Sequence, residues 1–154
     1  MNIRILQLLE GARDARGLTV IIDVFRAFST ACYAYDKGVE KIIPVGNIEE
    51  AYQLKKEHPE YILMGERNEM KPHGFDFGNS PTHLEAARLA GKTVVHTTSS
   101  GTQGIAAARV PEILTGSFVN AGAIVRYIKE RQPETVSLVC MGYACEFATD
   151  EDTF

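Results

Sequence analysis

The sequence lacks the features that would place it in a membrane, in an export pathway or on nucleic acid. None of its apolar runs approaches the roughly 18 to 20 residues that a transmembrane helix needs. The opening MNIRILQLLEGARDARG has no continuous apolar region of the kind that a signal peptide carries. Basic residues are scattered and the net charge is −4, so no basic patch for nucleic acid is expected. We therefore expect a cytoplasmic protein.

Cysteine is scarce and shows no paired spacing. The three residues are Cys32, Cys140 and Cys145, and an odd number without paired spacing fits a reducing compartment. The separation of Cys140 and Cys145 does not match a zinc-binding pair, and no C-x5-R loop of a cysteine-dependent phosphatase is present. Internal repeats, low-complexity runs and linkers are also missing. These absences favour a single domain over residues 1–154.

What the sequence does contain is an alternation of β-branched runs with helical patterns. This alternation is typical of an α/β fold, and we expect three α/β/α layers around a mostly parallel or mixed sheet. The predicted strands lie at residues 3–6, 18–24, 41–45, 61–64, 93–97, 112–115 and 135–140. The predicted helices lie at residues 27–37, 48–57, 82–90, 102–109 and 121–131, the second, third and last preceded by Asn47, Ser80 and Asn120 as capping residues.

Polar side chains follow the predicted strands, at the sheet edge where α/β proteins bind ligands. Asp23 ends the strand at 18–24 and is either the cap of the next helix, a metal ligand or an acid–base group. Arg26 either pairs with Asp23 or binds an oxyanion, because its planar guanidinium matches such groups bidentately. Glu66 and Arg67 form either a surface turn or an anion site assisted by a cation. An acidic stretch, Asp150 to Asp152, follows the last strand.

Two loops rich in hydroxyl groups and glycine are further candidates for binding an anion. Residues 96–102, HTTSSGT, precede a predicted helix, whose free N–H groups can receive a phosphate. The loop lacks the lysine and spacing of a P-loop, and a serine-capped connection is the alternative. The second loop, GSFVN, spans residues 116–120. The predicted ligand-binding residues of the two loops are Thr98, Ser100, Gly101, Thr102, Ser117 and Asn120.

The segment GFDFGNSP at residues 74–81 combines backbone freedom with polar side chains before a predicted helix. Asp76, Asn79 and Ser80 would lie near the positive end of that helix, able to bind a metal or a ligand. Alternatively, these side chains satisfy their own loop. Because no histidine spacing suggests a metal site, oxygen ligands for Mg²⁺ are the expectation.

Five segments taken together resemble the 2-phosphosulfolactate phosphatase family. The segments, in matching order and spacing, are IDVFRAFST (22–30), MGER (64–67), GFDFGNSP (74–81), TTSSGT (97–102) and GSFVNA (116–121). The resemblance implies a magnesium-dependent phosphatase that hydrolyses (2R)-2-phospho-3-sulfolactate to 3-sulfolactate and phosphate, a step in coenzyme M biosynthesis. It implies that Arg26 and Arg67 hold anionic groups of this small phosphoester, and that Asp23, Glu66 and Asp76 are metal ligands or acid–base groups.

The sequence departs from the family pattern in two respects. Ser100 stands where the family usually has asparagine, which removes an amide contact to the substrate. The sequence also stops at Phe154, where family members continue, so we expect the N-terminal part of a longer architecture. Apolar surface exposed in this way would favour a homo-oligomer. The alternatives are a phosphatase for another small polyanionic phosphoester and a non-catalytic domain that binds a small anion.

Overall fold

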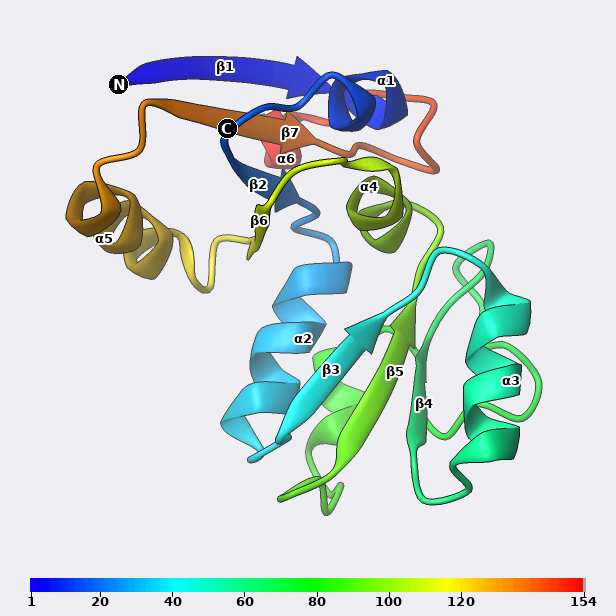
Figure 1. The fold of residues 1–154 in the computed structure, drawn as a ribbon. Helices are drawn as coiled ribbons and strands as arrows, with labels where there is room; N and C mark the ends of the chain where they lie inside the picture. The colour runs from blue at the N-terminus through cyan, green and yellow to red at the C-terminus, as the bar shows by residue number, and fades with distance from the viewer. Residues whose placement is uncertain (154) are drawn as a thin grey trace.

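The strands of the protein form where β-branched residues cluster, as such residues pack well on a pleated surface. A computed structural model describes residues 1–153 (Figure 1). All seven predicted strands are confirmed. Their bounds are β1 (Asn2–Gln7), β2 (Leu18–Ile22), β3 (Lys41–Pro44), β4 (Ile62–Gly65), β5 (Thr93–Thr97), β6 (Glu112–Gly116) and β7 (Thr135–Cys140).

The strands belong to two separate parallel sheets, one above the other in Figure 1. One sheet has the order β1-β7-β2-β6 and the other has the order β3-β5-β4. Every pairing between these strands is parallel, which confirms the predicted α/β class. The division into two sheets was not predicted, because strand pairing depends on contacts between distant parts of the chain.

Four of the predicted helices are present, and two short ones were not predicted. The predicted helices are α2 (Ala27–Asp36), α3 (Ile48–Glu57), α4 (Gly101–Ala107) and α5 (Ala121–Arg131), and the unpredicted ones are α1 (Leu8–Arg13) and α6 (Asp150–Thr153). Asn47 caps α3 as expected, since its side chain accepts a hydrogen bond from the Glu49 N–H. Among residues 1–153, no helix has both the length and the apolar character needed to cross a membrane.

The prediction of a helix at residues 82–90 is wrong. Only a short 3₁₀ helix, η1 (Pro81–Leu84), forms there, and a turn follows with the Ala87 N–H bonded to the Leu84 carbonyl. The reason lies in Leu84 and Leu89, which are both buried in one apolar cluster with Met64. Side chains five residues apart point about 140° away from each other on an α-helix. Burying both in one cluster therefore favours the irregular path.

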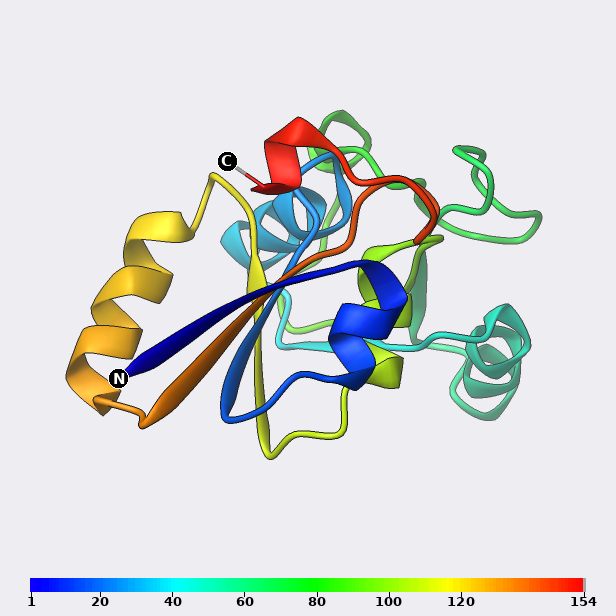
Figure 2. The same ribbon diagram turned by 90° about the horizontal axis from the view of Figure 1, so that it is seen from above.

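Helices α1 and α4 cover one face of the four-stranded sheet, and α5 lies on its other side (Figure 2). The covered face holds a buried core, with Ile21 and Val139 packed against Ala12 of α1. Helix α2 leads from this sheet to the three-stranded one. The carboxyl ends of β2 and β7 thereby come close to those of β4 and β5, and the candidate site lies between them.

Candidate functional site

A cavity of about 410 Å³ opens where the carboxyl ends of strands from both sheets meet. Its volume lies within the range of small-molecule sites, and its position is the one at which α/β proteins bind ligands. The described residues that line it are Asp23, Phe25, Arg26, Glu66, Asn68, Glu69, Asn79, Ser99, Ser100, Gly142, Tyr143, Ala144, Thr149, Glu151 and Asp152. Five of the predicted site residues are among them: Asp23, Arg26, Glu66, Asn79 and Ser100.

Asp23 connects the beginnings of two helices at the bottom of the cavity. Its Oδ1 accepts a hydrogen bond of 3.0 Å from the N–H of Ala27 in α2, and its Oδ2 accepts one of 2.8 Å from the N–H of Gly101 in α4. Gly101 has to be glycine, since a Cβ there would lie 2.8 Å from Asp23 Oδ2 and 2.9 Å from the Phe28 ring. The N-cap residue of α2 is Arg26, so Asp23 is not the cap that one interpretation predicted, although its carboxylate binds the first N–H of that helix and lines the cavity.

The pKa of Asp23 is raised to about 7, chiefly by burial. The carboxylates of Asp152 and Glu66 add to this rise, and the N–H groups of Ala27 and Gly101 oppose it. A carboxyl group with a pKa near neutrality is held partly protonated at physiological pH. Such a group can both give and accept a proton, which is the requirement for general acid–base catalysis.

Glu66 ties the end of β4 to the loop after β5. Its Oε1 accepts from the Ser99 N–H at 2.6 Å, and its Oε2 accepts from the Ser99 hydroxyl and the Glu69 N–H, both at 2.9 Å. A carboxylate has about four lone-pair sites, so capacity remains for a ligand on the cavity side. The loop HTTSSGT thus contributes Ser99, which was not among the predicted residues.

Arg26 lines the cavity without a strong partner of its own. Within residues 1–153, the only hydrogen bond of its side chain is a long one, 3.4 Å from Nη1 to the Ser80 hydroxyl. Among residues 1–153 it forms no salt bridge, so the predicted pairing with Asp23 is not present. Its guanidinium is consequently available to an anion.

The acidic stretch after β7 completes the cavity wall. The sequence analysis noted this stretch but did not include its residues among the predicted site residues. Asp152 Oδ1 accepts from the Val24 N–H and Asp152 Oδ2 from the Gly142 N–H, each at 2.8 Å. Its carboxylate therefore joins the ends of β2 and β7. Thr149 precedes it on the same wall, and within residues 1–153 its buried hydroxyl has no hydrogen-bond partner.

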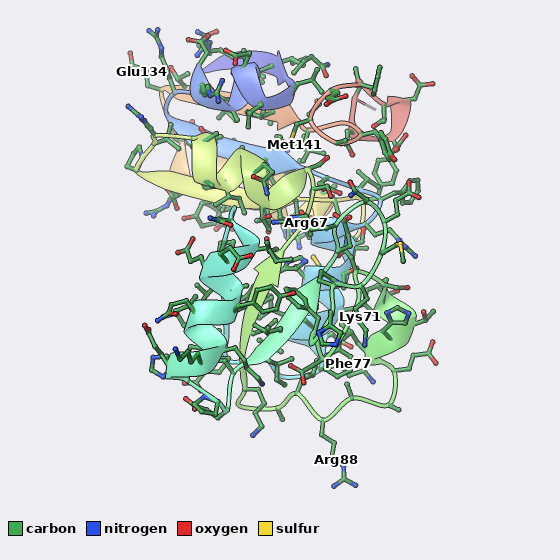
Figure 3. The ribbon with its side chains drawn as sticks, turned by 90° about the vertical axis from the view of Figure 1, so that its right-hand side faces the viewer. Arg67, Lys71, Phe77, Arg88, Glu134 and Met141 are labelled. Carbon is green, nitrogen blue, oxygen red and sulfur yellow. The ribbon has the colours of Figure 1, made fainter. Side chains whose placement is uncertain are left out.

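Two charged residues predicted for the site lie outside the cavity. The guanidinium of Arg67 donates to the carbonyls of Glu66 and Gly46 and to the Thr97 hydroxyl, and Figure 3 shows it at the junction of the two sheets. The Asp76 carboxylate accepts from the Leu63 N–H at 2.8 Å and lies 3.6 Å from Lys55. Its segment pairs with the edge of β4, since a bridge joins Phe77 to Met64. Both side chains therefore form hydrogen bonds that stabilise the surrounding loops and strands.

The remaining predicted residues also hold local structure. Thr98 and Thr102 exchange hydrogen bonds between backbone N–H and hydroxyl groups in both directions. Asn120 does not cap α5 with its side chain, which instead accepts from the Ser117 N–H and donates to the Thr115 carbonyl. Neither Ser117 nor Asn120 lines the cavity, and Ser80 reaches it only through Arg26.

The donor chemistry of the cavity fits a divalent cation, although no cage is preformed. Of the described lining residues, five are carboxylates (Asp23, Glu66, Glu69, Glu151 and Asp152) and one, Arg26, is basic. Within residues 1–153, no three His, Cys, Asp or Glu side chains are placed to hold a metal ion together, so Asp23, Glu66 and Asp76 do not form the predicted set. Mg²⁺ commonly binds through one or two carboxylates together with substrate oxygens, and the wall around Glu66 offers that arrangement.

His96 and Asp23 give the protein two opposite dependences of stability on pH. Burial lowers the pKa of His96 in β5 to about 4, so its contribution to stability is complete above pH 6.5 and is lost as pH falls toward 4. The raised pKa of Asp23 acts the other way, because the folded state binds a proton there between about pH 7 and 3.8. Between pH 7 and 5 each contribution changes by about 2 kcal/mol.

We therefore expect the two contributions nearly to cancel in the unaltered chain and to separate in variants. On acidification from pH 7 to 5, the free energy of unfolding of Asp23→Asn should fall by about 2 kcal/mol relative to the unaltered chain. That of His96→Gln should rise by a similar amount. Urea unfolding at both pH values measures the differences, and identical pH dependences in all three proteins would contradict the assignment.

Comparisons with known proteins agree with the resemblance found in the sequence. A family described as 2-phosphosulpholactate phosphatase matches residues 4–154. Proteins named probable 2-phosphosulfolactate phosphatase from Thermotoga petrophila and Thermotoga maritima are 45% and 44% identical to the chain, over 86% of its length. A protein of that name from Caldanaerobacter subterraneus is 37% identical. The match covers 56% of each of these three relatives, so the chain spans about half their length. The chain belongs to the 2-phosphosulpholactate phosphatase family.

Proposed function

We propose that the protein is a magnesium-dependent phosphatase that hydrolyses (2R)-2-phospho-3-sulfolactate to 3-sulfolactate and phosphate. The observation that carries the proposal is Asp23, a buried carboxyl group with a pKa of about 7. It lines the same cavity as Arg26, which forms no salt bridge with any of residues 1–153. The names of its relatives support the substrate. In this proposal the protein works in the cytoplasm and supplies sulfolactate to coenzyme M biosynthesis.

The side chains of the cavity divide the work of hydrolysis. Arg26 binds and orients an anionic group of the substrate, since a guanidinium pairs bidentately with phosphate, sulfonate or carboxylate. Attack by water forms a new P–O bond while the ester P–O bond breaks, and the leaving alkoxide needs a proton. Asp23 in its protonated form donates that proton, and the proton that the attacking water releases restores the acid.

Glu66 is the residue that would hold Mg²⁺, and the carboxylates of Glu69 and Glu151 also line the cavity. The cation supplies charge neutralisation on the phosphoryl oxygens when it is bound. The need for it follows from the charge of the cavity, because an anionic substrate would otherwise meet five carboxylates and a single guanidinium. Asp76, which the sequence suggested as a third ligand, lies outside the cavity and has no part in this proposal.

Phosphate release from racemic phosphosulfolactate, with Mg²⁺ and then with excess EDTA, tests the function. We expect release that EDTA abolishes and that added Mg²⁺ restores. Phospholactate, which lacks the sulfonate, is the control for substrate identity and should react more slowly. Equal rates would favour a phosphatase of broader specificity. Binding of phosphosulfolactate without phosphate release would contradict catalysis and favour an anion-binding domain.

A further inference from the structure

The side of the four-stranded sheet next to α5 carries an apolar groove that is separate in chemistry from the acidic cavity. The groove has a volume of about 430 Å³. Its floor and its α5 wall are made chiefly by Val20, Ile22, Val136, Leu138, Ile124 and Ile128. Contiguous apolar surface of this kind on a protein commonly marks a place of interaction.

Strand register shows why this side of the sheet is apolar. Ile5 pairs with Leu138, and Leu138 pairs with Val20, so all three side chains project to the same face. The edge strand β1 is open there, with Ile3 and Ile5 exposed to 55% and 66%. Parallel sheets are normally covered on both faces. In this sheet, α1 and α4 cover one face, whereas α5 borders the other face without covering it.

Helix α5 borders the groove but leaves it open. None of its residues is buried, even though Ile124, Val125 and Ile128 point to the groove. In the segment before α5, Phe118 and Val119 are 57% and 58% exposed. Figure 2 shows α5 standing alone on its side of the sheet. A further layer of polypeptide packed on α5 and β1 would bury these side chains.

The relatives contain polypeptide of suitable extent. The matched stretch is 56% of the Thermotoga petrophila protein, so close to half of that protein lies outside the match. We propose that the groove is the docking surface for the polypeptide that the relatives carry outside the matched stretch. The occupant buries the exposed faces of β1 and α5 and completes the second covering layer of the sheet.

Docking at the groove also reaches the acidic cavity. Glu151 and Asp152 of α6 line both the groove and the cavity, and Asp152 bonds to the ends of β2 and β7. A segment seated in the groove therefore contacts the helix that holds one wall of the cavity in place. The inference does not depend on the proposed reaction, because binding is measured without turnover.

The test adds the part of the Thermotoga petrophila relative that lies outside the matched stretch to the intact 154-residue chain. We expect binding by calorimetry and slower amide hydrogen exchange in α5, β1 and α6. Ile128→Asp should weaken binding about 10- to 100-fold, because burying an isoleucine side chain contributes about 1.5–3 kcal/mol. Ala123→Asp is the matched control: it adds the same charge to an exposed position of α5 outside the groove and should leave binding unchanged.

Two results would overturn the proposal. The first is unchanged exchange in α5 and β1, both with the added segment and with the same segment joined covalently to the chain, a form that does not require the segment to fold alone. The second is a concentration-dependent dimer in sedimentation that Ile128→Asp abolishes, because a second copy of the chain would then be the occupant. Circular dichroism of both aspartate variants establishes that they are folded.

Discussion

Asp23→Asn should lower kcat for phosphate release about 10²- to 10⁴-fold, the usual contribution of a positioned acid–base group. The substitution removes the titrating proton and keeps the shape of the side chain. The Asp23 carboxylate accepts hydrogen bonds from the N–H groups of Ala27 and Gly101. In the variant the amide NH₂ of asparagine faces one of these N–H groups and leaves it without an acceptor, which costs about 1–3 kcal/mol of stability. Steady-state kinetics at saturating substrate measures the loss.

A separate control distinguishes loss of chemistry from loss of structure. Asp36→Asn makes the same chemical change at an exposed residue near the end of α2 and should leave kcat unaltered. Circular dichroism and urea unfolding will show whether Asp23→Asn retains the fold. A folded variant that works at the original rate would exclude Asp23 from the reaction.

Arg26→Lys should raise KM about 10- to 100-fold with a smaller change in kcat. Lysine keeps the positive charge and loses the planar pair of donors that grips an oxyanion bidentately. A hydrogen bond to a charged group contributes about 1.5–3 kcal/mol, and each 1.4 kcal/mol is a factor of ten in affinity. Initial rates over a range of phosphosulfolactate concentrations separate KM from kcat.

The matched control for this prediction is Arg88→Lys. The Arg88 side chain extends away from the body of the protein in Figure 3, and it does not line the cavity. Its replacement should leave KM unchanged. If Arg26→Lys also left KM unchanged, Arg26 would not bind the substrate. Its role would then be structural, through its hydrogen bond to Ser80.

Local patterns in the sequence predict the strands well and the helices less well. Each strand is a compact β-branched run, and burial in a parallel sheet reinforces that preference. The helix expected at residues 82–90 fails because Leu84 and Leu89 are drawn into one cluster. Helix α1 is absent from the prediction because its six residues are too few to show a clear helical period. The two-sheet arrangement depends on pairings that no local pattern encodes.

The candidate site was predictable where it follows the ends of strands. Asp23 and Glu66 come directly after β2 and β4, Ser100 lies three residues after the end of β5, and the cavity lies at those ends. Arg67 immediately follows Glu66, but its guanidinium turns to the Gly46 carbonyl and the Thr97 hydroxyl. A sequence does not show which of two neighbours faces a ligand. Glu69 was missed because a backbone turn brings it to the cavity, and Asp152 was noted only as part of the acidic stretch after β7.

The hydrogen bond between Asp152 and Val24 joins residues 128 positions apart, and this has a consequence for folding during synthesis. Closing so long a loop carries an entropic cost, and contacts between distant residues form late. Strand β2 and Asp23 emerge early from the ribosome, whereas the carboxylate that fixes the end of β2 emerges among the last residues of this sequence. The floor of the cavity is thus made first and its wall much later, so the nascent chain passes through a stage in which Asp23 is present without Asp152.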